Sequence, residues 1–245
     1  MSKGKKLLID ADMVVFQAAA ANEFEARWTD DVHTLHSKFD DCVDFFHNWY
    51  DNTAEEFETD EMIFAFSDAH NFRKDVDDTY KANRKKSRKP LCYTALKDYV
   101  NAKFKTACWP SLEADDVLGI LATHSKAGDC IIISDDKDLL TVPAMVYRLG
   151  VLHDIDNDTA DYNFLTQCLV GDATDGYKGC PGIGEKRAAA ILDGNANWPT
   201  VVAAYEKAGL SESAALIQAR LARILRSEDY DTKNKKVKLW EPKKT

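Results

Sequence analysis

Short apolar segments that end in acidic residues constrain this chain more than any other feature. KKLLIDAD, MIFAFSD and DCIIISDDKD each run from aliphatic or aromatic residues into aspartates, and AMVYRL is a plausible fourth strand. Stretches with helical character separate them, which predicts an α/β fold with a parallel sheet. Ligands of such sheets gather at the carboxyl ends of the strands. We therefore expect Asp10, Asp68 and Asp136 to lie at one edge of the sheet.

Helices are expected between these strands. Residues 13–21 have helical character, and residues 34–58 place apolar side chains, Leu35 and Phe39 among them, at three- and four-residue steps. LEADDVLGILATHSKAG predicts a helix that ends at Gly128. The polar stretch 71–90 has no apolar face, so we expect it to be mobile or ordered by a substrate.

The pattern becomes helical throughout after residue 157. TADYNFLTQCLVGD, GIGEKRAAAILDG, NWPTVVAAYEKAG and SESAALIQARLARILRS are separated by Gly, Pro or Asn. KKVKLWEP is extended and is a candidate to rejoin the sheet. A chain of 245 residues suits one large domain with a smaller appendage. We place the boundary between residues 157 and 158.

Charge is segregated along the chain, although the net charge is −9. Residues 23–61 carry thirteen acidic side chains against two basic ones, whereas residues 81–89 carry six basic side chains and no acid. The tail from residue 233 has six lysines against Glu241. Local potential decides which partners bind, so an acidic composition does not exclude a polyanionic substrate.

The location is expected to be the cytoplasm. No apolar run approaches the ~20 residues of a membrane helix, and the first residues, MSKGKKLLID, lack a signal-peptide core. The six cysteines are scattered without a CxxC pair, which indicates reduced thiols rather than a thiolate zinc site.

Clustered carboxylates indicate a metal centre. Two unit charges ~4 Å apart repel by ~4 kcal/mol at an effective dielectric of 20, so converging acids need cations. Oxygen ligands suit Mg²⁺ or Mn²⁺, and two such ions can clamp the attacking and leaving oxygens of a phosphodiester. The alternative is that single acids cap helices, which we expect of Asp12 and Asp135. The clusters are Asp10 with Asp12; Asp68; Glu113, Asp115 and Asp116; Asp135, Asp136 and Asp138; Asp172 and Asp175.

A basic segment, TYKANRKKSRK, follows the second acid-tipped strand. As a phosphate clamp it would use Lys81 as electrostatic stabiliser and Arg84 as a bidentate partner, with Tyr80 stacked on a terminal base. The alternative is a solvated basic face.

A glycine-rich turn, GCPGIGEKRAAAIL, leads directly into a helix. Gly179, Gly182 and Gly184 around Pro181 expose backbone N–H groups that can hold a DNA phosphate, with charge added by Lys186 and Arg187. Such contacts carry no sequence preference. A turn without a ligand is the alternative.

These motifs together resemble the 5′-nuclease (flap endonuclease, PIN-like) superfamily. LVGDATDGYKGCPGIGEKRAAAIL is similar to its helix–three-turn–helix, and LLIDAD, FSDAHNFRKDVDDTYKANRKK, LEADDVLG and IIISDDKDLL match its other blocks in order. Tailed-bacteriophage replication 5′→3′ exonucleases look most similar. The resemblance implies a PIN-like catalytic domain at 1–157 with a basic arch at about 70–110. The helical DNA-binding region, 158–245, would hold the helix–three-turn–helix at about 165–195.

The resemblance also implies residue roles. One metal ion would be served by Asp10, Asp68, Glu113, Asp115 and Asp116, and a second by Asp136, Asp138, Asp172 and Asp175. The catalytic set would be Asp10, Asp68, Lys81, Arg84, Glu113 and Asp136. DNA would be bound by Arg73, Tyr80, Lys81, Arg84, Lys85, Lys86, Gly182, Gly184, Lys186 and Arg187.

The function implied is a Mg²⁺-dependent 5′→3′ exonuclease of phage DNA replication or recombination. Mn²⁺ would substitute for Mg²⁺, and K⁺ would sit in the helix–three-turn–helix. Substrates would be duplex DNA with 5′ ends, nicks or flaps, and RNA–DNA hybrids, bound by a monomer in the host cytoplasm without a membrane. Ala11 stands where the family often has Gly. The short stretch between Lys81 and Glu113 favours end resection over flap cutting.

Two other functions compete with this one. A strand followed by DxD also begins haloacid-dehalogenase phosphatases, with Asp10 as nucleophile and Asp12 as acid/base, but that scheme leaves EADD, YKANRKK and GCPGIGEKRA unexplained. A catalytically inactive DNA-binding module is the non-enzymatic alternative. A binder of polyanions has no use for nine clustered anions, which argues against it.

Overall fold

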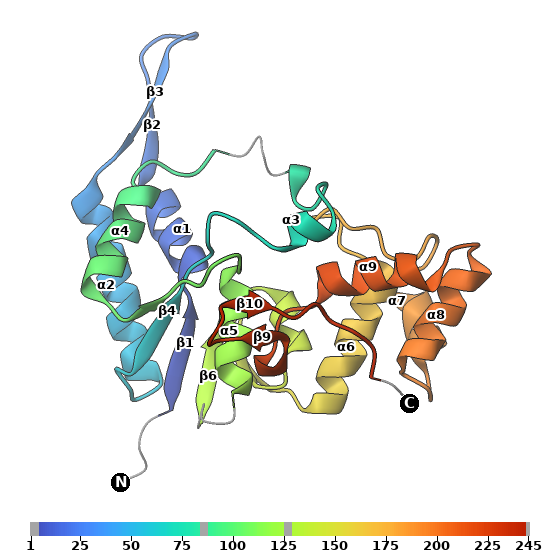
Figure 1. Cartoon of the computed structure of the whole chain (residues 1–245). Helices are drawn as coiled ribbons and strands as arrows, with labels where there is room; N and C mark the ends of the chain where they lie inside the picture. Colours follow the sequence, from blue (N-terminus) through green and yellow to red (C-terminus); the bar gives the residue numbers. More distant parts are fainter. Residues whose placement is uncertain (1–4, 84–87, 125–128, 244–245) are drawn as a thin grey trace.

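A six-stranded sheet forms the centre of the protein (Figure 1). The computed structural model describes residues 5–83, 88–124 and 129–243. The strands pair in parallel except the last, which runs antiparallel to its neighbour, so the predicted α/β fold is confirmed. Their spatial order is β5 (Thr106–Ala107), β4 (Met62–Ala65), β1 (Lys6–Asp10), β6 (Cys130–Ile133), β7 (Met145–Arg148) and β8 (Val151–Asp154).

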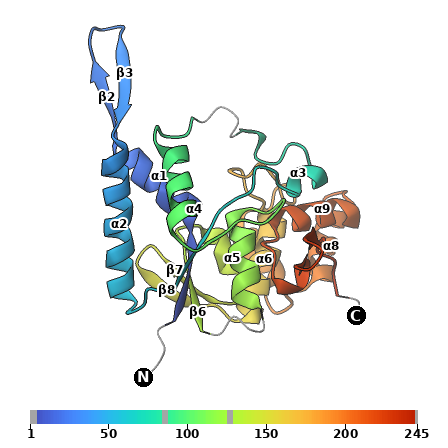
Figure 2. The same cartoon turned by 60° about the vertical axis from the view of Figure 1, so that its left-hand side comes forward.

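Helices cover both faces of this sheet (Figure 2). One face packs against α1 (Ala11–Ala21), α2 (Phe39–Glu56) and α4 (Tyr93–Lys103), around the touching rings of Phe46, Phe64 and Phe104. The other face packs against α5 (Ala114–Thr123), whose Val117, Leu118 and Ile120 are buried. No helix in the described ranges is both long enough and apolar enough to span a bilayer.

The chain is mainly helical after about residue 157, as predicted. A separate core forms around Tyr205, whose hydroxyl donates to the carbonyl of Cys168 at 2.7 Å. Five short elements lie before or after the helices of this region: α3 (Arg73–Val76), the 3-10 helices η2 (Lys137–Thr141) and η3 (Ser227–Asp229), β9 (Tyr230–Asp231) and β10 (Lys236–Val237). The helices are α6 (Asn157–Val170), α7 (Glu185–Leu192), α8 (Trp198–Lys207) and α9 (Glu212–Ala222).

Three expectations about secondary structure were wrong. The helix predicted over 34–58 starts only at Phe39, because the preceding residues form a protruding hairpin of β2 (Glu23–Arg27) and β3 (His33–Ser37) (Figure 1). KKVKLWEP does not rejoin the main sheet, since β10 pairs with β9. Within the stretch 71–90, Phe72 and Tyr80 are buried, so its described part packs against the protein. Gly128, predicted as a helix end, lies outside the described residues.

The chain returns to the sheet side of the molecule after α9. Ile224 and Leu225 join the core beneath α5, and Gly119 of that helix lies against them. A Cβ atom at Gly119 would come within 2.4 Å of the Leu225 carbonyl oxygen. This contact between two backbones requires glycine.

We predict that Gly119→Ala destabilises the protein, although alanine is the better helix former. The overpacked methyl should lower the free energy of unfolding by about 1–3 kcal/mol. Gly184→Ala is the control, because its Cβ meets nothing within 4 Å. Gly184 is the N-cap of α7, so the variant should lose only the cap preference of glycine over alanine, less than about 1 kcal/mol. Urea unfolding of both variants measures this, and equal stabilities would contradict the packing described.

Candidate active site

Two neighbouring strands bring Asp10 and Asp136 to the same edge of the sheet. Asp10 is the last residue of β1, and Asp136 follows β6, which pairs with β1 in parallel. Ser134 links them, because its hydroxyl donates to Asp10 Oδ2 at 2.8 Å and accepts the N–H of Asp136 at 3.1 Å. Burial raises the pKa of Asp10 to about 6, and the charges of Asp12 and Asp136 add to the rise. Asp10 also caps α1 through the N–H of Met13, so capping and the carboxylate cluster coexist.

The first turn of α5 adds Glu113 and Asp115 to this edge. Burial, then repulsion by the charges of Asp10 and Asp136, raise the pKa of Asp115 well above its ordinary value. Glu113 behaves in the opposite way. Lys81 and Arg73 outweigh its burial and lower its pKa to about 2.

A second group of carboxylates meets the first across a small hollow. This hollow lies between the sheet with α5 and the helical region after residue 157. Its lining includes Glu113, Asp115, Asp138 and Asp175. Burial, then the charge of Asp136, raise the pKa of Asp138 to about 7. The sheet and the helical region therefore each supply part of one acidic site.

A pinched loop positions Asp172 and Asp175. Gly171 and Gly179 close it with positive φ angles of 74° and 63°. A Cβ at Gly179 would lie 2.4 Å from the nitrogen of Gly171, so the two backbones pass too closely for a side chain. Within the loop, Asp172 accepts the backbone N–H groups of Thr174 and Asp175.

Basic side chains neutralise part of this charge. Lys81 Nζ lies 2.6 Å from Glu113 Oε1 and 3.3 Å from Asp175 Oδ2, so it joins the two halves of the site. Its backbone has a φ of 53° and donates to the Asp175 carbonyl at 2.8 Å. A non-glycine residue in this region stores strain, which is typical of functional positions. Lys137 lies 3.1 Å from Asp172 Oδ2.

Several residues assigned by resemblance lie elsewhere. Asp116 is fully buried and pairs with Arg73, so neither the metal role of Asp116 nor the DNA role of Arg73 fits the geometry. Tyr80 is only 3% exposed, which leaves no open ring face for a base. Asp68, in contrast, follows the carboxyl end of β4, which pairs in parallel with β1, so it lies at the predicted edge. It accepts the N–H of Ser111 at 2.8 Å, which lowers its pKa. Arg84, Lys85 and Lys86 lie outside the described residues.

Three supporting residues escaped sequence reasoning. Ser134 bridges Asp10 and Asp136, and Gln167 of α6 donates to Asp138 Oδ1 at 2.7 Å. Neither carries a signal that separates it from ordinary polar residues. Lys137 had one, because it stands between two of the predicted ligands in DDKD. Asp12 is not a plain cap, since it accepts the N–H of Ser67 and the hydroxyl of Tyr93.

The later part of the glycine-rich turn lies at the surface. Gly179 does not, because it is buried and its N–H donates to Gln218 Oε1 at 2.9 Å, so the expectation that Gly179 offers a free N–H was wrong. Gly182, Gly184, Lys186 and Arg187 are all exposed, and Gly184 is the N-cap of α7. Arg187 donates to the Gly182 carbonyl at 2.9 Å.

The carboxylate site suits hard divalent cations by its chemistry. Its donors are oxygens only, and the raised pKa values of Asp10, Asp115 and Asp138 mark charge that the protein leaves poorly compensated. Among the described residues, no three acidic, histidine or cysteine side chains already close around an ion position. The lysines that contact Glu113 and Asp172 would have to withdraw as cations enter.

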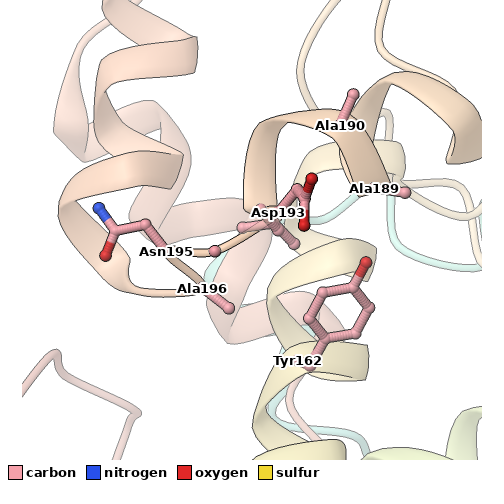
Figure 3. A pocket seen from close by; sticks show the side chains of 8 residues that line it. Tyr162, Ala189, Ala190, Asp193, Asn195 and Ala196 are labelled. Carbon is pink, nitrogen blue, oxygen red and sulfur yellow. The ribbon is translucent and has the colours of Figure 1, made fainter.

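A larger hollow lies apart from this chemistry. Figure 3 shows it between α6 and the α7–α8 turn, where Tyr162, Asp193 and Asn195 line about 570 Å³. Asp193 is the one acid among its lining residues, so size alone does not mark the active site.

Comparison with known proteins assigns the family. The family model described as 5′-3′ exonuclease, N-terminal resolvase-like domain, matches residues 5–162. The exodeoxyribonuclease of Enterobacteria phage T3 is 31% identical over 97% of this chain and 93% of its own length. The exonuclease of Escherichia phage T7 is 30% identical over 96% and 93%.

The fold agrees with this assignment. A mutant T5 5′-exonuclease superposes with a TM-score of 0.65 at 14% identity, over 91% of this chain and 89% of that one. The bacteriophage T5 flap endonuclease in a pseudo-enzyme–product complex with DNA and metal ions gives 0.66 at 15% identity, over 90% and 89%. The chain therefore belongs to the 5′-3′ exonuclease family and is a nuclease that acts on DNA.

Proposed function

We propose that this nuclease is a Mg²⁺-dependent 5′→3′ exonuclease that hydrolyses phosphodiesters from the 5′ ends of duplex DNA. The observation that carries the proposal is the meeting of carboxylates from β1, from the first turn of α5, from the turn after β6 and from the loop 171–179. Relatives named exodeoxyribonuclease and exonuclease, from phages T3 and T7, support the DNA substrate and a phage setting. The process served would be DNA replication or recombination.

The donor set divides into two groups that would hold two ions. Asp10, Glu113 and Asp115 would serve one ion, and Asp138, Asp172 and Asp175 the other, with Asp136 between them. When bound, such ions supply the charge that stabilises the attacking and leaving oxygens of an in-line displacement. Mn²⁺ shares the preference for oxygen ligands and should replace Mg²⁺.

Lys81 is the side chain to which we assign the scissile phosphate. Its ammonium group contacts Glu113 and Asp175, one from each half of the site. Once metal ions satisfy these carboxylates, the ammonium can exchange them for a phosphate oxygen and stabilise the negative charge that develops during hydrolysis. Arg84 would assist from the basic arch.

The turn 179–184 would hold the duplex away from the reacting bond. The exposed Gly182 and Gly184 and the N-terminus of α7 suit a phosphate, and K⁺ in the turn would strengthen that contact. Such a grip reads no bases, which agrees with an enzyme that resects any sequence. RNA–DNA hybrids and 5′ flaps are further substrates of this proposal, and the protein would act as a monomer in the host cytoplasm.

Replacing Asp136 tests the catalytic claim. On a 5′-labelled duplex with Mg²⁺, Asp136→Asn should lower the rate of nucleotide release from the 5′ end by about a hundredfold or more. The reason is that the carboxylate between the two proposed ion sites loses its charge. Asp135→Asn is the matched control and should stay within about threefold, since Asp135 is exposed beside the site. EDTA should abolish release. Equal loss in both variants, or cleavage in EDTA, would contradict the mechanism.

Acid should stabilise the metal-free protein over part of the pH range. Asp10 and Asp138 have pKa values of about 6 and about 7 against an ordinary 3.8, so the folded state binds more protons than the unfolded state between pH 4 and 7. Stability therefore falls as pH rises through that window. Glu113, with a pKa of about 2, opposes this only below about pH 4.

We predict a higher melting temperature at pH 5.5 than at pH 8 after metal removal, and a larger gain on adding Mg²⁺ at pH 8. Thermal unfolding at the two pH values, with and without Mg²⁺, measures both effects. A metal-free protein that melts higher at pH 8 would contradict the described burial of these carboxylates.

Removing the basic pair beside the turn should weaken binding without changing sequence preference. For Lys186→Ala with Arg187→Ala, we expect the slope of log K against log salt for duplex binding in Ca²⁺ to fall by about 2. The control is Lys5→Ala with Lys6→Ala, which removes equal charge at the amino end of β1, the end of the strand away from Asp10. Equal slopes in the two double variants would contradict the assignment of this turn to DNA.

A further inference from the structure

We propose that Asp116 is the counter-ion of Arg73, not a metal ligand, and that this buried pair positions Glu113 for catalysis. The inference rests on the proposed metal-dependent hydrolysis. It departs from the role that the family resemblance implies for Asp116, and it concerns side chains that never contact the substrate.

The two side chains of the pair are buried and bonded in two places. Arg73 is 2% exposed and Asp116 is 0% exposed. Arg73 Nη1 donates to Asp116 Oδ2, and Nη2 donates to Oδ1, both at 2.7 Å. This bidentate geometry is the strongest that arginine makes with a carboxylate.

The oxygens of Asp116 have no acceptor capacity left for a cation. Oδ1 also accepts the N–H of Leu225 at 3.1 Å, and Oδ2 accepts the N–H of Glu113 at 3.2 Å. A carboxylate offers about four lone-pair sites, and four donors occupy them here. Asp115 contrasts with this, because it lines the small hollow together with Glu113, Asp138 and Asp175.

The guanidinium of Arg73 is equally saturated. Nε donates to the carbonyl of Leu221 at 2.9 Å, and Nη2 donates to that of Arg223 at 2.6 Å. Nη1 completes the set with Glu113 Oε2 at 3.3 Å. Withdrawing Asp116 towards a metal ion would leave a full positive charge buried without its partner, which is strongly unfavourable.

Glu113 is held by this pair at two points. Asp116 fixes its backbone N–H, and Arg73 contacts its side chain. The remaining contacts of the Glu113 carboxylate are the Tyr80 hydroxyl at 3.0 Å and Lys81 Nζ at 2.6 Å. Arg73 also donates to the carbonyl of Leu221, in the last turn of α9, and to that of Arg223, which follows the helix. The position of Glu113 therefore depends on the helical region.

The first experiment compares Asp116→Asn with its neighbour Asp115→Asn in the full-length protein. Free Mn²⁺ is counted by electron paramagnetic resonance, and melting temperatures are taken without metal. Asp115→Asn should weaken Mn²⁺ binding by about tenfold or more without lowering the metal-free melting temperature. Asp116→Asn should bind Mn²⁺ within about threefold of the wild type but melt about 6 °C lower or more.

A double variant tests the pairing even if a single variant fails to fold. Arg73→Met with Asp116→Leu replaces the pair by apolar groups, and it should melt higher than either single variant. It should also weaken Mn²⁺ binding less than Asp115→Asn does, because Glu113 keeps its contacts with Tyr80 and Lys81.

The positioning role has a kinetic signature. Arg73→Lys keeps the positive charge but loses the bidentate contact with Asp116. We therefore expect kcat to fall by about tenfold while KM for DNA stays within about threefold. A purely structural role would leave the kcat of the folded protein unchanged.

Asp116→Asn with an unchanged melting temperature and a Mn²⁺ loss equal to that of Asp115→Asn would overturn the proposal. So would a double variant that melts below both single variants. If the wild-type protein binds no Mn²⁺, the proposed metal-dependent function fails, whereas the melting temperatures still judge the pairing.

Discussion

Mutual repulsion among carboxylates is the constraint on which the rest of this structure depends. Adjacent parallel strands deliver Asp10 and Asp136 to one edge, and α5 begins there with Asp115. Because the pairing of β1 with β6 brings these carboxylates together, they cannot move apart while that pairing is kept. Lys81 and Lys137 compensate it in part, and the raised pKa values of Asp115 and Asp138 show where compensation is missing.

The same constraint explains how the helical region is joined to the sheet. Lys81 bridges Glu113 and Asp175, so a favourable contact between the halves exists because both carry acids. The loop 171–179 continues directly into the turn 179–184. Its glycine pinch therefore ties the carboxylates to the surface proposed to hold DNA, and a duplex gripped at that turn would meet the site at a set distance.

Much of this arrangement was accessible from the sequence. Apolar segments ending in acids predicted the sheet and its functional edge, because strand direction fixes where those acids go. The hairpin of β2 and β3 was missed, since Leu35 and Phe39 also satisfy a helical period. The pairing proposed for Asp116 could not be predicted, because its spacing from Glu113 on a helix says nothing about a partner. That partner, Arg73, lies 43 positions earlier in the sequence and meets Asp116 only in the folded chain.

The central claim is that the carboxylates of both halves form one site for two divalent cations. Anomalous diffraction from crystals soaked in Mn²⁺ tests it most directly, because the scattering locates each ion independently of activity. Our account predicts one peak beside Asp10 and Asp115 and a second beside Asp138, Asp172 and Asp175, with Asp116 still bound to Arg73. Peaks confined to other surfaces, or a peak bound by Asp116 in place of Arg73, would contradict it.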